Sequence, residues 1–409
     1  MYWASFLHIY QPPVQERWIV EKVADECYRK LVKTLRENPG GRLTLNINGS
    51  LTEQFHHYGM NDILDGLREL AEEGRIEFTG SAMYHPVLPL IPEKEVRRQI
   101  RLNQEVNRKY LGEAFQPRGF FPPEMCYNRR LAEIVKEEGF SWIIADELSY
   151  NGHLARIAPG RTYSVKGLDG FGIFFKERKY SAALTYGKYR NLEEFLADLD
   201  PGYHRRETYL LTGTDGEIYG HHHQGLENLL VEAFRHPEIK TCTISELPEY
   251  FPAREEVETV AASWSTWEDE LEAGIPYPQW DFPGNQLHEL QWRLTNLALE
   301  AVAEAGEEEP ARSQLDRGLH SCQYWWASCR QYFNVEMIEK GAAQLLEAIK
   351  STGNTEKIRE AETLAAEIGE TARQWRDSGY AERLIREYQR THEDVAHELT
   401  FGGAKTLTL

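Results

Sequence analysis

The sequence of 409 residues contains few cysteines, and their spacing argues against the common cysteine-based sites. Five cysteines are present, an odd number, and no two stand at the two-residue spacing of zinc and redox motifs. They are Cys27, Cys126, Cys242, Cys322 and Cys329. We therefore expect reduced, mostly buried thiols, and we expect neither a bound metal nor another cofactor.

The chain also lacks a long apolar run and is short of positive charge. No segment approaches the roughly 20 consecutive apolar residues that cross a bilayer, and the first residues show no basic region followed by an apolar core. Acidic residues outnumber basic ones by 65 to 46, which gives a net charge of −19. This charge disfavours nucleic acids and anionic membranes as partners. We expect a cytoplasmic protein, and its oligomeric state stays open.

Strand-like apolar runs alternate with amphipathic helical patterns over residues 1–258. The expected strands are 3–9, 43–47, 76–79, 119–121, 141–145, 173–175, 209–212 and 241–244. Such alternation predicts parallel strands that are joined by right-handed helical crossovers. Seven or eight units of this kind indicate an α/β fold in which the sheet closes, or nearly closes, into a barrel.

The alternation stops after residue 258, and three further segments follow. Residues 259–284 are rich in proline and aromatic side chains, and we expect an irregular connection that contributes to the functional site. Residues 285–400 show an almost wholly helical pattern, which predicts an all-α domain packed on the barrel. Residues 401–409 are expected to form a flexible tail.

Two carboxylates stand directly after strand-like runs. Asp215 follows the apolar run at 208–211, and Glu124 follows the run at 119–121, which two prolines end. In parallel α/β proteins the carboxyl ends of the strands form the ligand-binding face. A pair of carboxylates there points to glycoside hydrolysis, in which one attacks the anomeric carbon and the other donates and recovers a proton.

Five short regions, in a fixed order, carry a resemblance to a known family. They are His8 to Pro12; Gly74 to Thr79 with Tyr84-His85-Pro86 to Pro89; Gly119 to Glu124; Asp215-Gly216-Glu217 with Gly220; and Ser263-Trp264 with Trp280, Asn285 and His288. On these motifs the chain resembles glycoside hydrolase family 57, whose members act on α-glucans as amylases, pullulanases, branching enzymes or 4-α-glucanotransferases. The resemblance implies an incomplete (β/α)7 barrel followed by a helical domain.

The resemblance also implies roles for individual residues. Glu124 matches the nucleophile and Asp215 the acid/base of a retaining mechanism, while His8, Gln11 and His85 match substrate-contacting positions. The implied partner is an α-glucan or maltooligosaccharide with α-1,4 links, and α-1,6 links are a further target. The first step needs an ionised Glu124 and a protonated Asp215, so we expect the neighbours to push the two pKa values apart.

Four more residues are expected at the substrate. Glu217 stands two positions after Asp215, where it would bond sugar hydroxyls or tune the pKa of Asp215. His221 would contact substrate and, together with His8, lower the pKa of Glu124. Trp264 and Trp267 would offer aromatic faces, which stack on the apolar faces of sugar rings.

Two departures from the family pattern leave the substrate subsites open. Tyr10 stands where the first motif usually carries its second histidine, and the histidines at 221–223 stand near a position that is often tryptophan. A second hypothesis is a metal-dependent polysaccharide deacetylase, which would need His8, Asp215 and His221 to converge on one ion. A third hypothesis is a glycan-binding protein without turnover.

Overall fold

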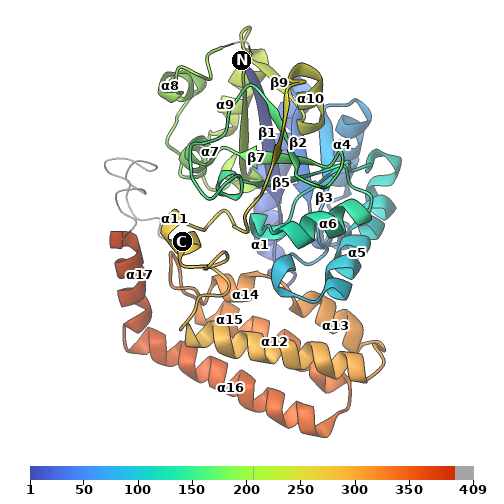
Figure 1. Cartoon of the computed structure of the whole chain (residues 1–409). Coiled ribbons are helices and arrows are strands. Elements are labelled where there is room, and N and C mark those ends of the chain that lie inside the picture. Colours follow the sequence, from blue (N-terminus) through green and yellow to red (C-terminus); the bar gives the residue numbers. More distant parts are fainter. Residues whose placement is uncertain (206, 392–409) are drawn as a thin grey trace.

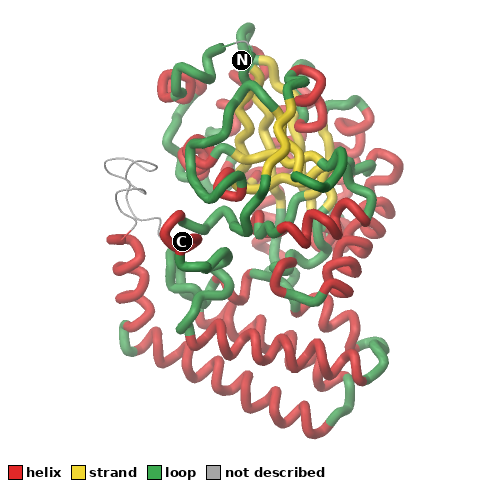
Figure 2. The backbone as a smooth tube through the Cα atoms, viewed as in Figure 1, coloured by secondary structure: helices red, strands yellow, loops and turns green. Residues whose placement is uncertain are grey.

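The computed structural model describes residues 1–205 and 207–391, and its centre is a curled β-sheet (Figure 1). The sheet contains ten strands in the order β10-β6-β7-β5-β4-β3-β2-β1-β8, and β9 pairs with β1. Figure 2 shows the strands gathered in the upper half of the molecule and long helices in the lower half. The predicted tail at 401–409 and the last part of the predicted helical domain, 392–400, lie outside the described residues.

All eight expected strands are present, and two short strands were not expected. The strands are β1 (Tyr2–Ile9), β2 (Leu43–Ile47), β3 (Ile76–Gly80), β4 (Gly119–Phe120), β5 (Trp142–Asp146), β6 (Thr162–Val165), β7 (Gly172–Lys176), β8 (Tyr209–Asp215), β9 (Lys240–Cys242) and β10 (Arg254–Val257). The unexpected pair, β6 and β10, extends the sheet beyond β7, and β6 runs antiparallel to β7. Four-residue strands of this kind are too short to give a clear alternating pattern.

Seven parallel strands form the wall of an incomplete barrel. Their order is β7-β5-β4-β3-β2-β1-β8, with parallel pairing between neighbours. The two outer strands, β7 and β8, approach each other, and the Glu177 N–H donates to the Leu211 carbonyl at 2.9 Å. The predicted incomplete (β/α)7 barrel is therefore confirmed.

Amphipathic helices cover the barrel. They are α1 (Arg17–Val23), α2 (Arg29–Glu37), α3 (Gly49–His57), α4 (Asn61–Glu72), α5 (Glu93–Leu111), α6 (Arg129–Glu137), α7 (Arg178–Thr185), α8 (Leu192–Asp198), α9 (Glu227–Arg235) and α10 (Leu247–Tyr250). In α2, for example, Leu31 and Leu35 are four residues apart and buried, while Lys33 and Arg36 are exposed. Burial of such apolar stripes against the sheet is the main favourable term that holds each helix in place.

Single turns connect several of these elements. One is a π-helical turn, η1 (Ala24–Tyr28), which joins α1 to α2. The others are 3₁₀ turns: η2 (Leu88–Leu90), η3 (Gly112–Ala114), η4 (Pro123–Met125), η5 (Glu147–Ser149), η6 (Gly216–Ile218) and η7 (Ile244–Glu246). Two of the 3₁₀ turns lie at the expected catalytic residues: η4 contains Glu124, and η6 begins directly after Asp215.

The chain after the barrel is helical, as the sequence predicts, and lies beneath it in Figure 1. Its helices are α11 (Glu268–Glu272), α12 (Gln286–Glu304), α13 (Ala311–Gly318), α14 (Cys322–Trp325), α15 (Val335–Ser351), α16 (Thr355–Asp377) and α17 (Tyr380–Thr391). Leu294, Leu345 and Ile368 are fully buried where α12, α15 and α16 pack together. The helices share one apolar cluster with the barrel residues Phe120 and Ile143, so the two regions form a continuous core.

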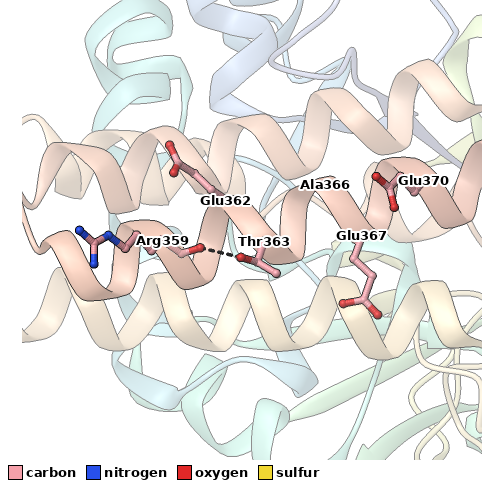
Figure 3. Close-up of a pocket in the computed structure, with 6 residues that line it drawn as sticks. All are labelled: Arg359, Glu362, Thr363, Ala366, Glu367 and Glu370. Carbon is pink, nitrogen blue, oxygen red and sulfur yellow. Dashed lines mark hydrogen bonds between the residues drawn. The ribbon is translucent and has the colours of Figure 1, made fainter.

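The outer surface of the helical region is polar. A hollow of about 690 Å³ lies along α16. Figure 3 shows its lining residues, all of which are exposed: Arg359, Glu362, Thr363, Ala366, Glu367 and Glu370. The Thr363 hydroxyl there donates to the Arg359 carbonyl at 2.9 Å. Part of the large negative charge thus lies on a solvated helix face. Within the described residues, no helix is both long and apolar enough to cross a membrane.

Candidate functional site

Glu124 stands at the carboxyl end of β4 in an unusual backbone conformation. Pro122 and Pro123 follow the two-residue strand, and proline cannot donate to a sheet ladder, so the chain turns away from the sheet. Glu124 has φ 60° and Met125 has φ 48°, both in the left-handed region. A non-glycine residue held there costs on the order of 1–3 kcal/mol, and such residues cluster at functional sites. His85, after β3, has φ 59° and adds a third such residue.

Both oxygens of the Glu124 carboxyl accept a hydrogen bond from outside the barrel. The Ser321 hydroxyl donates to Oε1 at 2.7 Å, and the Trp264 indole N–H donates to Oε2 at 3.0 Å. His85 Nδ1 lies 3.5 Å from Oε1. The sequence predicted Trp264 and His85 at this site as substrate contacts, whereas it gave no signal for Ser321, which lies 197 residues further along the chain.

Residues of the first and second motifs lie together beside Glu124. His8 Nε2 and His85 Nε2 are 3.1 Å apart, and His8 Nδ1 lies 2.8 Å from Asn46 Oδ1. The Tyr10 ring stacks on the His85 ring with centroids 4.2 Å apart. Burial lowers the pKa of His8 to about 4 and that of His85 well below its usual value. The expectation that a positive His8 lowers the pKa of Glu124 is therefore wrong, because burial keeps the imidazole neutral.

Asp215 ends β8, and its Cα pairs in register with that of His8 on the neighbouring strand. The residue is exposed to solvent. Surrounding protein raises the pKa of its carboxyl to about 6, and the Lys176 ammonium opposes that rise. Lys176 is itself buried and paired with Asp146, with Nζ 3.2 Å from Oδ2.

Glu217 lies beneath Asp215 and is buried. Its Oε1 accepts from the Tyr10 backbone N–H at 3.2 Å and from the Tyr28 hydroxyl. Gln11 joins the same network, because its amide donates to the Tyr28 oxygen at 3.3 Å. Burial, followed by the charge of Asp215, raises the pKa of Glu217 to about 8. The Lys176 ammonium limits the rise at Asp215, whereas the charge of Asp215 adds to the rise at Glu217.

The π-helical turn η1 holds the loop that follows Asp215. Glu26 Oε2 lies 2.6 Å from His221 Nδ1, and the Cys27 thiol donates to the Gly216 carbonyl at 3.1 Å. The next residue is Tyr28, which donates to Glu217. Three consecutive residues of one turn thus contact the loop. π-Helical turns occur frequently at functional sites, and here the turn replaces part of a regular amphipathic helix that the sequence pattern predicted.

His221 was expected to lower the pKa of Glu124, but its imidazole pairs with a different carboxylate. His221 bonds with Glu26, and His223 Nε2 lies 2.8 Å from the Thr185 carbonyl. His8 faces His85 and Asn46, so the three residues of the deacetylase hypothesis do not converge. Among the described residues, no group of three or more His, Cys, Asp or Glu side chains is arranged to hold a metal ion.

Trp267 lies at the contact between the connection and the last described helix. Its indole N–H donates to the Tyr388 hydroxyl at 2.9 Å, and the Arg178 guanidinium lies 5.5 Å from its ring centre. Arg178 in turn binds the backbone carbonyls of Thr266 and Ser263. These contacts give Trp267 a part in holding the connection against α7 and α17.

The pKa values of the two expected catalytic carboxyls do not have the order that a first step requires. Burial raises the pKa of Glu124 to about 7; the bonds from Trp264 and Ser321 limit this rise, and the charge of Asp215 adds to it. The pKa of Asp215 is about 6. Burial is the largest cause of the rise at both carboxyls.

Comparisons with known proteins agree with this fold. An α-amylase of Pyrococcus furiosus is 30% identical over 144 residues, which cover 35% of this chain and 22% of the amylase. The chain therefore spans about a fifth of the length of that relative. The structure of a 4-α-glucanotransferase from Thermococcus litoralis matches with a TM-score of 0.68 at 18% identity, covering 85% of this chain and 59% of that one.

A branching enzyme of GH57 type from Pyrococcus horikoshii has a similar structure, with a TM-score of 0.64 at 18% identity. The match covers 89% of this chain and 94% of the branching enzyme, so the likeness in fold includes the helical region. The model of glycosyl hydrolase family 57 matches residues 5–260, more than half of the sequence. This match includes the seven strands of the barrel wall, apart from the first three residues of β1, and both expected catalytic carboxylates, and the chain belongs to glycosyl hydrolase family 57.

Proposed function

We propose that this protein is a retaining enzyme of the α-amylase or 4-α-glucanotransferase type that acts on α-glucans or maltooligosaccharides. The observation that carries the proposal is the pair Glu124 and Asp215. Both follow strands of the same barrel wall, at their carboxyl ends, and the charge of one raises the pKa of the other. Family membership and the names of the relatives support an α-glucan as substrate, with α-1,4 links and with α-1,6 links as a further target.

In the first step Glu124 attacks the anomeric carbon and forms a β-linked glycosyl-enzyme. The bond to the leaving sugar breaks, and Asp215 gives its proton to the leaving oxygen. The donors Ser321 and Trp264 support the ionised form of Glu124, because a hydrogen bond to a carboxylate favours its charged state. Preorganised donors of this kind cost no reorganisation during the reaction.

The pKa of Asp215, and therefore whether it carries a proton, depends on its surroundings. In the free protein its pKa is about 6, below that of Glu124. A bound glucan would displace water from this exposed carboxyl, and loss of water raises the pKa of a carboxylic acid. Substrate binding would thus supply the separation of pKa values that the unliganded site lacks.

In the second step Asp215 removes a proton from the acceptor, whose oxygen then displaces Glu124 from the anomeric carbon. Water as acceptor gives hydrolysis, and a sugar hydroxyl gives transfer to a new chain. No metal or cofactor enters either step. The first- and second-motif residues His8, Gln11 and His85, together with Glu217, His221, Trp264 and Trp267, are proposed to bind the glucan around the two carboxyls.

The proposal is tested by incubation with a single maltooligosaccharide, such as maltoheptaose, followed by separation of the products. Shorter products alone indicate hydrolysis, and shorter together with longer products indicate transfer. Proton NMR during the first turnovers reports the anomer released, and retention requires the α-anomer. Release of the β-anomer, or unchanged substrate with every α-glucan offered, would overturn the assignment. Loss of acetyl groups from an acetylated glycan would support the deacetylase instead.

A further inference from the structure

The segment before α14 lies against the second motif of the barrel. The Ser321 backbone N–H donates to the His85 carbonyl at 2.9 Å, and His320 forms an antiparallel bridge with Pro86. Ser321 is completely buried. Backbone pairing therefore places the Ser321 side chain relative to the barrel, although it belongs to the helical region.

The Ser321 hydroxyl does not cap the helix that follows it, although its position predicts a cap. Ser321 is the residue that precedes α14, where a serine oxygen normally accepts from the N–H groups of the first turn. Here the side chain makes no such bond. The hydroxyl instead donates to Glu124 Oε1 at 2.7 Å and lies 2.9 Å from His85 Nδ1. The helix start forgoes a cap, which is worth about 1 kcal/mol, in favour of a bond to the carboxylate.

The direction of the hydrogen bonds follows from the chemistry of the groups. The Asn46 amide NH₂ donates to Thr79 Oγ1 at 3.1 Å, so its Oδ1 accepts from His8 Nδ1–H at 2.8 Å. The neutral His8 then accepts at Nε2 from His85 Nε2–H, across 3.1 Å, which leaves His85 Nδ1 as an acceptor. The Ser321 hydroxyl therefore lies between two acceptors, Glu124 Oε1 at 2.7 Å and His85 Nδ1 at 2.9 Å, and it donates to the nearer carboxylate.

We propose that Ser321 is a positioning residue through which the helical region orients the carboxylate of Glu124 for attack on the anomeric carbon. The proposal rests on the proposed function, because it concerns the nucleophile of that reaction. Trp264 holds Oε2 and Ser321 holds Oε1, so the two donors together restrict rotation of the carboxyl plane. Trp264 alone leaves Oε1 free to turn away. The barrel itself supplies neither donor.

The first experiment compares kinetics of Ser321→Ala with the parent on a maltooligosaccharide. Ser321→Ala removes a hydrogen bond to the charged nucleophile, so we expect kcat to fall by about 10- to 100-fold. KM should change by less than about threefold, because the hydroxyl contacts the nucleophile and not the sugar in this geometry. Ser321→Thr keeps the hydroxyl and should recover part of the loss.

A matched control removes another serine hydroxyl from the same stretch of chain. Ser328 is also buried, and its oxygen accepts from the Gln279 amide at 2.9 Å. The Arg330 backbone N–H also donates to it, at 3.4 Å, so Ser328→Ala deletes two buried bonds without touching Glu124, and its kcat should stay near that of the parent. If Ser321→Ala does not fold, Ser321→Cys takes its place, since a thiol has a similar size and donates weakly.

The pH profile separates positioning from a general structural effect. The Ser321 bond lowers the pKa of Glu124, so its removal should move the acid limb of kcat/KM to higher pH. The titratable groups that face Glu124 are His85, Asp215, Tyr10, Cys126 and Cys322. Burial keeps the imidazole, the phenol and both thiols neutral near pH 7, which leaves the carboxyls to shape this limb.

A second readout follows the nucleophile directly. A 5-fluoro-α-glucosyl fluoride traps the glycosyl-enzyme, and intact-mass spectrometry gives the rate of labelling at Glu124. Slower labelling of Ser321→Ala, with a shifted acid limb and partial recovery in Ser321→Thr, supports the proposal. Equal kinetics in parent and Ser321→Ala would overturn it, as would a slower variant with an unchanged acid limb. A parent that neither turns over α-glucans nor becomes labelled would instead refute the proposed function.

Discussion

Glu124 and Asp215 are supported by different parts of the molecule. Glu124 accepts hydrogen bonds from Trp264 in the connection and from Ser321 in the helical region. The loop after Asp215 is held by the barrel's own π-helical turn, through Tyr28 and its neighbours. The barrel therefore assembles the side of Asp215, the proposed acid/base, by itself, whereas the side of Glu124, the proposed nucleophile, is complete only when the later regions pack against it.

The two carboxylates therefore depend on different regions of the chain for their support. The donors to Glu124 are 140 and 197 residues away in sequence, so any displacement of the helical region acts first on the nucleophile. The acid/base loop depends on contacts within the first half of the chain and the strand that carries it. The predictions below are designed to affect one side at a time.

The largest effect is expected from Glu124→Gln, which removes the proposed nucleophile while keeping the shape of the side chain and one acceptor oxygen. An amide cannot form the glycosyl-enzyme, so we expect kcat on maltooligosaccharides to fall by about 10,000-fold. Initial rates give the loss, and circular dichroism with glucan binding by calorimetry controls for fold and substrate affinity. Activity within about tenfold of the parent would show that Glu124 is not the nucleophile.

Asp215→Asn tests the other side and should depend on the leaving group. With a maltooligosaccharide, loss of the general acid should lower the rate by about 100- to 10,000-fold. With α-glucosyl fluoride the leaving group needs little protonation, so formation of the glycosyl-enzyme should be largely restored. The comparison uses the burst of fluoride release. Equal damage with both substrates would argue against an acid role for Asp215, and Glu124→Gln should stay inactive with both.

Much of this arrangement could be predicted from local sequence patterns, and the exceptions have physical reasons. Glu124 and Asp215 each follow an apolar run, so their place at the carboxyl ends of strands could be inferred. Ser321 carries no such signal, because a serine before a short helix indicates an ordinary cap. Tyr28 lies on the buried face of an amphipathic pattern, where an aromatic residue normally indicates core packing.

The expected effects of His8 and His221 on the pKa of Glu124 were wrong, because both depend on contacts that only the folded chain forms. A histidine at the end of a barrel strand suggests a positive neighbour for a carboxylate on the same face, but only the folded chain shows that His8 is buried and that burial lowers its pKa to about 4. The contact between His221 and Glu26 likewise depends on a π-helical turn, which sequence periodicity does not predict. Burial and long-range pairing are tertiary properties, and they decide the charges at this site.

A moderate effect is expected from Tyr28→Phe, which removes one donor on the acid/base side. The Tyr28 bond lowers the pKa of Glu217, so its loss makes Glu217 neutral over a wider pH range. With a pKa of about 8 or above, Glu217 is neutral near pH 7 in both proteins, so the basic limb of kcat/KM should stay in place. The lost bond loosens the loop after Asp215, and we expect a fall in kcat of about 3- to 10-fold at pH 7.

The control for Tyr28→Phe is Tyr163→Phe, which removes another buried phenol from the barrel. Tyr163 is buried, and its oxygen accepts from the Ala158 backbone N–H at 2.8 Å, away from the carboxyls. Its pH profile should match that of the parent. A Tyr28→Phe protein that shifts the acid limb, which Glu124 sets, would contradict the separation of the two sides.

The smallest effect is expected in stability, from Glu217→Gln. The folded protein raises the pKa of Glu217 to about 8, from about 4.5 in the unfolded chain. The folded state therefore keeps a proton that the unfolded state releases, and this group loses stability for the protein as pH rises from 4.5 to 8. Glutamine stays neutral throughout and retains an oxygen for Tyr28 and Tyr10. Its free energy of unfolding should equal that of the parent near pH 4.5.

Above that pH the glutamine variant should become the more stable protein, by at most about 1.4 kcal/mol for each pH unit. Urea unfolding of both proteins at pH 5 and pH 8 measures the difference. A stabilisation that is present at pH 8 and much smaller at pH 5 would show that Glu217 keeps its proton in the folded protein. It would assign this buried, neutral carboxyl to the part of the site that the barrel forms by itself. A variant less stable than the parent at pH 8 would mean that Glu217 is ionised in the folded state, and the charge that raises the pKa of Asp215 would then be present before substrate binds.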